Sequence, residues 1–170
     1  FTPKQEAYLE KLRGESDGFL AQNEKVKILT SEVISALFDV SNESAFNRKS
    51  KQLLPEVQLP QNQLIDIRAQ IAESKLVFLE EKSVRRIFEV MEEIYQFRYE
   101  YNQKVIEFVN LGTTIDFNVE LQRKTLWVII GELEEMEKQL PSLKTKLVDA
   151  LRAVDHRLAN KLSEYPFLWK

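Results

Sequence analysis

The amino-acid sequence predicts an all-α protein, folded as an elongated antiparallel up-down-up bundle of three long helices with coiled-coil-like packing. The strongest sign lies in the last third of the chain, where apolar residues recur at intervals of seven: Leu126, Leu133, Leu140, Leu147 and Val154. The first four are each followed three positions later by a second apolar residue. This a/d heptad is typical of a helix that lays a narrow apolar stripe against partner helices. The alternating, Gly/Pro-bounded runs of a β-sheet are missing from the sequence.

The first predicted helix covers residues 3 to about 41. It opens on Thr-Pro-Lys-Gln at residues 2–5, which is a capping box with proline at the first helical position. Apolar residues then follow in steps of three, four or seven. Glu15 and Gln22 fall on the apolar face of this helix, so the core beside it is not expected to be purely hydrophobic.

Residues 42–60 differ in character from the helix before them. Pro55 and Pro60 frame a segment without a strong apolar period, so we expect an irregular connection at about 42–60, compatible with a short helix at 44–53. A long connection of this kind is often functional. It carries a cluster of basic residues, namely Arg48, Lys49 and Lys51.

The second long helix is predicted at 61–110. Its apolar stripe slips by one residue at 80–83, which indicates either local overwinding of one helix or a break with Ser83 as N-cap. The residues are good helix formers and favour continuity, whereas a break would give a four-helix bundle. Gly112 is the expected helix stop, and Asp116 the expected N-cap of the next helix.

The last long helix is predicted at 117–164, with Pro141 inside it. A proline in a helix interior removes one hydrogen bond and costs about 3 kcal/mol. The heptad phase nevertheless passes through Pro141 unchanged, and Leu140 would be a poor N-cap for a new helix. We therefore expect a kink near residues 137–141 and no reversal of the chain.

Composition limits the domain organisation and the partners. Residues 1–170 are expected to form a single helical-bundle domain, since 170 residues with 44% apolar side chains can bury a core of their own. The net charge of −3, with no clustered basic face, argues against nucleic acid as a partner. The absence of cysteine excludes thiolate chemistry and is compatible with either the cytoplasm or the bacterial periplasm.

Residues that carry chemistry are scarce, and we expect no catalytic residue, no metal site and no cofactor. His156 is the only histidine and lies off the apolar stripe, which indicates an ordinary surface residue. The acidic run of Glu132, Glu134, Glu135 and Glu137 is interpreted as a solvated helix face, with Glu134 paired to Lys138.

An aromatic run surrounds Arg98. Tyr95 is expected to face the core, Tyr99 and Tyr101 to flank it, and Phe97 to point away; a binding groove is the alternative to this packing role. We predict that Arg98 is partly buried and paired with a carboxylate. The candidate partners are Glu15 and Glu120.

These patterns favour a non-enzymatic interaction or scaffold module that binds another protein. The alternative is a ligand-sensing bundle attached to a membrane segment outside this sequence, and self-association and proximity to a membrane stay open. The partner-binding candidates are the two segments that a bundle does not require: the basic cluster Arg48, Lys49 and Lys51, and the tail residues Phe167, Leu168 and Trp169.

Overall fold

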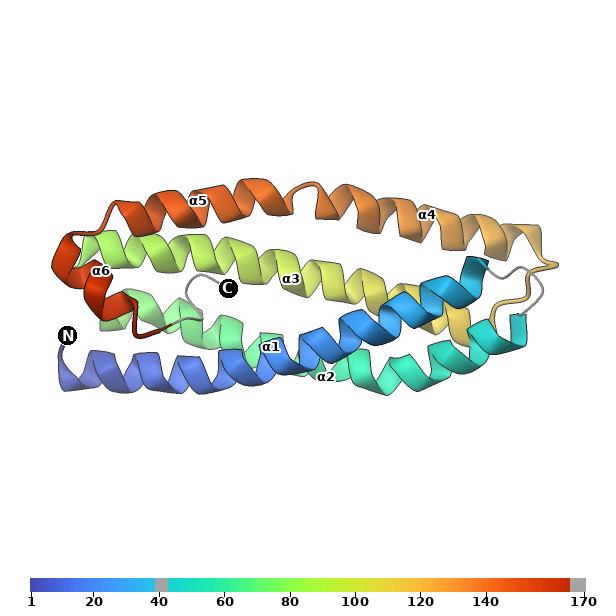
Figure 1. The fold of residues 1–170 in the computed structure, drawn as a ribbon, viewed down its shortest axis with the longest axis horizontal. Helices are drawn as coiled ribbons and strands as arrows, with labels where there is room; N and C mark the ends of the chain where they lie inside the picture. The colour runs from blue at the N-terminus through green and yellow to red at the C-terminus, as the bar shows by residue number, and fades with distance from the viewer. Residues whose placement is uncertain (39–42, 166–170) are drawn as a thin grey trace. The chain divides into compact units, whose positions relative to one another are not determined.

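A computed structural model describes residues 1–38 and 43–165, and the predicted all-α bundle is confirmed for them. Three long helices come first in the chain, followed by three shorter ones (Figure 1). Their bounds are α1 Pro3–Phe38, α2 Glu43–Val77, α3 Lys82–Thr114, α4 Glu120–Glu137, α5 Leu140–Arg152 and α6 His156–Leu162.

The chain divides into two compact units, each built from segments of several helices. Unit 1 comprises Phe1–Phe19, Gln63–Arg98 and Gln139–Lys170, and unit 2 comprises Leu20–Asn62 and Tyr99–Lys138. The first part of α1 and the second part of α2 therefore belong to unit 1. The single domain inferred from composition stays a prediction.

Helices α2 and α3 run antiparallel in unit 1. Lys75 on α2 forms an ion pair with Glu92 on α3 (3.6 Å). Nearer the turn between the two helices, the ring of Phe78 stacks on that of Phe88, with 5.4 Å between the centroids. Higher numbers on one helix thus meet lower numbers on its neighbour, as antiparallel packing requires.

The start of α1 follows the sequence prediction closely. The main-chain nitrogen of Thr2 donates to Oε1 of Gln5 (2.9 Å), and the nitrogen of Gln5 donates to Oγ1 of Thr2 (3.2 Å). This reciprocal pair is the predicted capping box, and it satisfies two donors that the first helical turn would otherwise leave open.

The irregular connection predicted at about 42–60 is wrong, because residues 43–60 lie within α2. Pro60 lacks an N–H, so the carbonyl of Glu56, four residues earlier, loses its helical donor. The side chain of Gln22 on α1 replaces that donor, since its Nε2 lies 3.1 Å from the Glu56 carbonyl oxygen. Pro55 is exposed to solvent. A contact with another helix therefore allows α2 to continue where the local sequence predicts a break.

The continuous helix favoured at 61–110 is also wrong, whereas the alternative of a break near 80–83 is confirmed. Helix α2 ends at Val77 and α3 begins at Lys82, so the one-residue slip in the apolar stripe marks a chain reversal. Ser83 lies inside α3 and is not its N-cap.

Gly112 is not the helix stop, because α3 continues to Thr114. A Cβ at Gly112 would lie only 3.0 Å from Cβ of Ser50 on α2 and closer still to its Oγ. This glycine therefore permits a close approach of two helices.

The predicted helix at 117–164 is three helices, α4, α5 and α6. Lys138 and Gln139 separate α4 from α5, within the region where a kink was expected, and both keep right-handed helical dihedrals. Pro141 occupies the first turn of α5, where its missing N–H breaks no helical hydrogen bond.

The caps of the last helices differ from the expected ones. Asp155 starts α6 by accepting a hydrogen bond from the nitrogen of Leu158 (2.9 Å). Asp116 is not the N-cap of α4, because Val119 occupies that position. The Oδ1 of Asp116 accepts instead from the nitrogen of Asn118 (2.9 Å).

The heptad stripe is buried or half-buried at each of its positions. Its residues are buried at both ends and half-buried in the middle. The buried ones are Leu126, Ile129, Leu147, Ala150 and Val154, and the half-buried ones are Leu133, Met136, Leu140 and Leu143.

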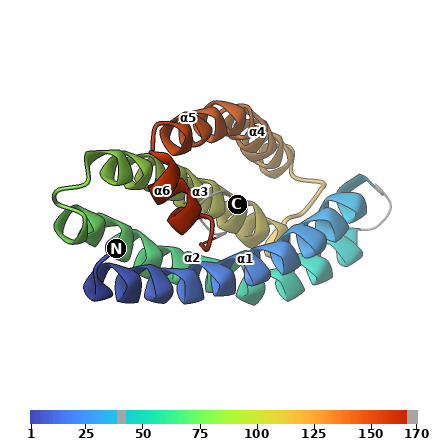
Figure 2. The same cartoon turned by 60° about the vertical axis from the view of Figure 1, so that its left-hand side comes forward.

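Each unit has its own apolar interior. In unit 1, the ring of Tyr8 on α1 makes edge contacts with two others, at 5.9 Å from Phe78 and 5.8 Å from Phe88. In unit 2, Phe46 of α2 packs edge-on against Phe108 of α3 at 6.0 Å. Within unit 1, α6 turns from the end of α5 toward the first part of α1 (Figures 1 and 2). There Nη2 of Arg13 donates to the carbonyl of Glu164 (2.6 Å).

Candidate functional site

The described residues hold no group of three or more His, Asp or Glu side chains that could bind a metal ion. His156 is exposed at the start of α6, as predicted. Three members of the acidic run of α4 are paired with cations or a phenol. Glu132 contacts Lys104, Glu135 contacts Lys138 (2.7 Å), and Glu137 accepts from the hydroxyl of Tyr101 (2.6 Å).

These pairings differ in one respect from the expected ones, because Lys138 contacts Glu135 and not Glu134. The hydrogen bond to Glu135 raises the pKa of the Lys138 ammonium. Burial, together with the Glu137 carboxylate, raises the pKa of the Tyr101 hydroxyl. Because each pKa is displaced upward and away from neutral pH, neither group is adapted to release a proton there.

Arg98 lies half-buried in unit 1 among aromatic rings. Its guanidinium carbon is 5.0 Å from the ring centroid of Tyr95 and 5.6 Å from that of Phe19, both within cation–π range. Glu15, one of the two predicted partners, is half-buried in the same unit. Glu120, the other, lies 3.1 Å from Lys124 on its own helix. The carboxylate partner of Arg98 stays a prediction.

The aromatic run of α3 is part of the packing, with one correction. Tyr95 is buried and Tyr99 and Tyr101 are half-buried, whereas Phe97, expected to point away, is buried as well. Phe97 lies about 200° around the helix axis from Tyr95. In unit 1, however, α3 also has α5 as a neighbour, to which an ion pair of Lys146 joins it. A helix with two neighbours buries a wider arc than a single apolar stripe indicates.

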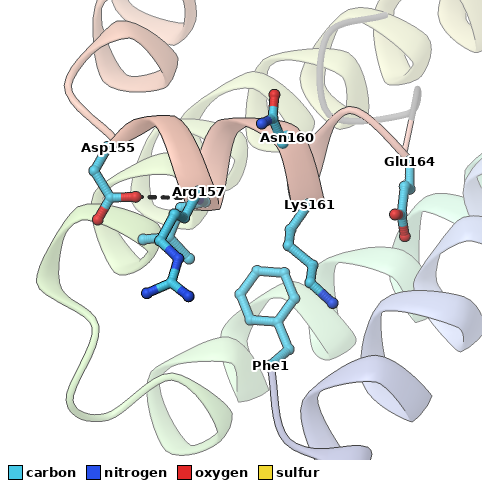
Figure 3. A pocket seen from close by; sticks show the side chains of 7 residues that line it. Phe1, Asp155, Arg157, Asn160, Lys161 and Glu164 are labelled. Atoms are coloured by element: carbon cyan, nitrogen blue, oxygen red, sulfur yellow. Dashed lines mark hydrogen bonds between the residues drawn. The ribbon is translucent and has the colours of Figure 1, made fainter.

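A shallow pocket of about 560 Å³ lies beside α6 in unit 1 (Figure 3). The ring of Phe1 and the stem of Lys161 point into it, whereas Asp155 is engaged in capping the helix (Figure 3). Two cations, Arg157 and Lys161, and two carboxylates, Asp155 and Glu164, line the pocket, so its charge favours no one class of ligand. Its lining residues are Phe1, Asp155, Arg157, Leu158, Asn160, Lys161 and Glu164.

Unit 2 carries an exposed pair of aromatic side chains. Phe38 at the end of α1 and Trp127 on α4 are 67% and 51% exposed, yet their ring centroids lie only 6.4 Å apart. Ile34, one helical turn before Phe38, is also exposed. Two helices thus bring three large apolar side chains to the surface of one unit.

The predicted basic cluster lies on α2 in unit 2. Arg48 and Lys51 are exposed and one turn apart, and Lys49 is half-buried. Within the described residues none of the three forms an ion pair. The remaining cations of this unit contact carboxylates or a main-chain carbonyl: Lys25, Lys27, Lys104, Arg123, Lys124 and Lys138.

Sequence reasoning missed the aromatic pair and favoured the tail, whose residues Phe167, Leu168 and Trp169 lie outside the described residues. A signal for Trp127 is present in the heptad, because it follows the stripe residue Leu126 by one position and so points off the stripe. The contact between Phe38 and Trp127 joins helices far apart in the chain, which periodicity along one helix does not report.

Comparisons with protein-family models, curated proteins and solved structures find no match to this chain. Among the helices of the described residues, none combines the length and the apolar character needed to cross a lipid bilayer. Inferences about function therefore rest on the surface of unit 2.

Proposed function

We propose that this chain is a non-enzymatic helical-bundle module that acts by binding another protein, and that unit 2 supplies the contact surface. The observation that carries the proposal is the exposed pair of Phe38 and Trp127. Aromatic residues are enriched at the energetic centres of protein interfaces, because a rigid ring buries much area at little entropic cost.

The binding free energy that this aromatic pair can contribute limits the kind of partner. Covering the exposed parts of the two rings would contribute on the order of 5 kcal/mol. Association itself costs about 4–15 kcal/mol in lost translational and rotational freedom. The aromatic pair alone therefore cannot hold a partner, and the contact must extend over neighbouring residues such as Ile34. A folded protein surface or an amphipathic helix offers that area.

Quantitative co-purification tests the proposal. The chain with Phe38→Ser and Trp127→Ser is compared with wild type, and any protein that wild type enriches is then purified and titrated against both. The matched control is Leu76→Ser with Leu79→Ser, which removes two exposed apolar side chains from unit 1 (76% and 61% exposed). We expect the partner to lose binding to the first variant and keep it for the control.

Equal binding of the partner to wild type and to the Phe38/Trp127 variant would contradict the proposal. Helix content and thermal unfolding of each variant show that the fold is retained. Both substituted side chains are mostly exposed, so we expect the two double variants to unfold close to the wild-type temperature.

A further inference from the structure

The most exposed positions of α2 in unit 2 carry no carboxylate. Between positions 44 and 62 the exposed residues are cations, neutral polar residues, one proline and one leucine. They are Ser44, Arg48, Lys51, Gln52, Pro55, Gln58, Leu59 and Asn62. Glu56 is the single carboxylate in these roughly five helical turns, and its side chain is 31% exposed.

The two acidic residues of this part of α2 are engaged elsewhere. Glu43 accepts a hydrogen bond from the nitrogen of Phe117 (3.0 Å). Glu56 accepts one from Nε2 of Gln22 (2.9 Å) and lies 3.1 Å from Nζ of Lys25. These two contacts hold the pKa of the Glu56 carboxyl below its ordinary value, so the group stays ionised and committed to α1. Neither carboxylate is therefore available to the exposed cations of α2.

We infer that this face of α2, hereafter the basic face, binds an acidic segment of the protein partner. The inference rests on the proposed function and names the chemistry of the partner. Arg48 offers a planar guanidinium suited to bidentate pairing with a carboxylate, and Lys51 adds a second cation one turn away. The amides of Gln52 and Gln58 can donate hydrogen bonds along the same face.

A lipid surface fits the basic face less well than a protein does. Each cation near an anionic membrane contributes about 1 kcal/mol, so the three basic residues together give only weak attachment. A stable surface helix also inserts an apolar face, whereas Leu59 and Pro55 are the only exposed apolar residues between 44 and 62.

A displayed library of random peptides, selected on the wild-type chain, tests the inference. We expect the enriched peptides to be rich in Asp and Glu. Their affinities, measured by fluorescence anisotropy, are expected to fall about tenfold or more for Arg48→Glu with Lys51→Glu, because like charges then face each other. The matched control is Lys11→Glu with Lys144→Glu, two exposed cations of unit 1; both double variants change the net charge from −3 to −7.

The outcomes separate this inference from the proposed function. Failure to enrich any peptide, enrichment without an acidic excess, or equal loss in both double variants would overturn the basic face as the site. Peptides that bind the charge-reversed chain normally but lose the Phe38→Ser, Trp127→Ser chain would leave the proposed function intact and refute only the inference. Sedimentation of wild type with vesicles of phosphatidylcholine and phosphatidylserine, abolished by Arg48→Glu with Lys51→Glu, would overturn the inference by assigning the face to lipid.

Discussion

The two units differ in how often a buried polar side chain lacks a hydrogen-bond partner, because most such groups among the described residues lie in unit 1. In unit 2, Asn47, Gln22 and Asn102 each donate an amide N–H to a main-chain carbonyl, at 2.7, 3.1 and 3.1 Å. In unit 1, the hydroxyl of Ser16 and the amide oxygen of Gln70 are buried without a hydrogen-bond partner among the described residues. In unit 2, the hydroxyl of Ser50 is the one such group among the described residues. Buried polar groups that are satisfied fix one packing arrangement, whereas unsatisfied ones cost free energy.

This difference teaches which polar residues of a helical bundle specify its structure. The amides of unit 2 link α2 to α1 and α3 at defined positions. Replacing them should therefore lower the free energy of unfolding clearly. The unpartnered groups of unit 1 should be replaceable by apolar side chains at little cost.

The largest effect is expected from closing the space at Gly112. With Gly112→Ala the new Cβ would clash with Oγ of Ser50 and lie 3.1 Å from the ring of Phe46. We expect the free energy of unfolding to fall by about 2–3 kcal/mol, from urea titrations. The control Gly131→Ala, in the same unit, has nothing within 4 Å of its Cβ and should stabilise by up to about 1 kcal/mol. Similar free energies of unfolding for the two variants would contradict this, because they would show that α2 and α3 can move apart at Gly112 without cost.

The next effect compares the two interiors directly. Asn102→Leu leaves the buried carbonyl of Val57 without its side-chain donor and should destabilise by about 1–3 kcal/mol. Ser16→Ala removes a hydroxyl that has no partner among the described residues and should be neutral or stabilising. Thermal and urea unfolding of both variants provide the values. A loss for Ser16→Ala as large as that for Asn102→Leu would abolish the distinction between the units.

A smaller effect on stability is expected from removing the Gln22 side chain, which bonds to the carbonyl left without a donor by Pro60. Gln22→Leu should cost about 1 kcal/mol, because the Glu56 carbonyl loses the donor that replaces the missing N–H. In the background of Pro60→Ala, whose N–H can bond to that carbonyl, the same change should cost less. A double-mutant cycle measures the coupling. Identical costs in both backgrounds would show that Gln22 does not compensate for the proline.

The smallest effect is the pH dependence of Glu56. Its pKa is lowered from the ordinary value of 4.5 in the folded chain, so its ionised form stabilises unit 2 above that pH. This contribution should disappear as the pH falls through the folded-state pKa. Wild type should therefore exceed Glu56→Gln in free energy of unfolding at neutral pH and converge with it in acid. A difference that stays constant with pH would assign the effect to packing.

Signals that lie within one helix were sufficient to predict the features that depend on that helix alone. The capping box at Thr2 and Gln5 formed as predicted, because its hydrogen bonds lie within one helical turn. The heptad stripe of the last third is buried or half-buried at each of its positions, although it passes over two helices, α4 and α5, and ends at Val154 between α5 and α6. Asp155 shows that a good N-cap inside an apolar period can start a new helix, and it could have been found from the sequence.

Features that depend on contacts between helices were not predicted. Pro60 is accommodated through Gln22, which lies on another helix, so the local rule that proline ends a helix gave the wrong result. Gly112 was interpreted as a stop, whereas it allows the approach of Ser50. The aromatic pair of Phe38 and Trp127 likewise joins distant segments. Each case depends on a partner that periodicity along one helix cannot identify.

The fluorescence of Trp127 tests the central claim most directly. The sequence contains two tryptophans, so Trp169→Phe leaves Trp127 as the sole indole of the chain. Because Trp127 is half-exposed in the free protein, a partner that covers the aromatic pair should shift its emission to shorter wavelength and shield it from quenching by iodide. Binding of a partner with the emission and quenching of Trp127 unchanged would contradict the assignment of this surface.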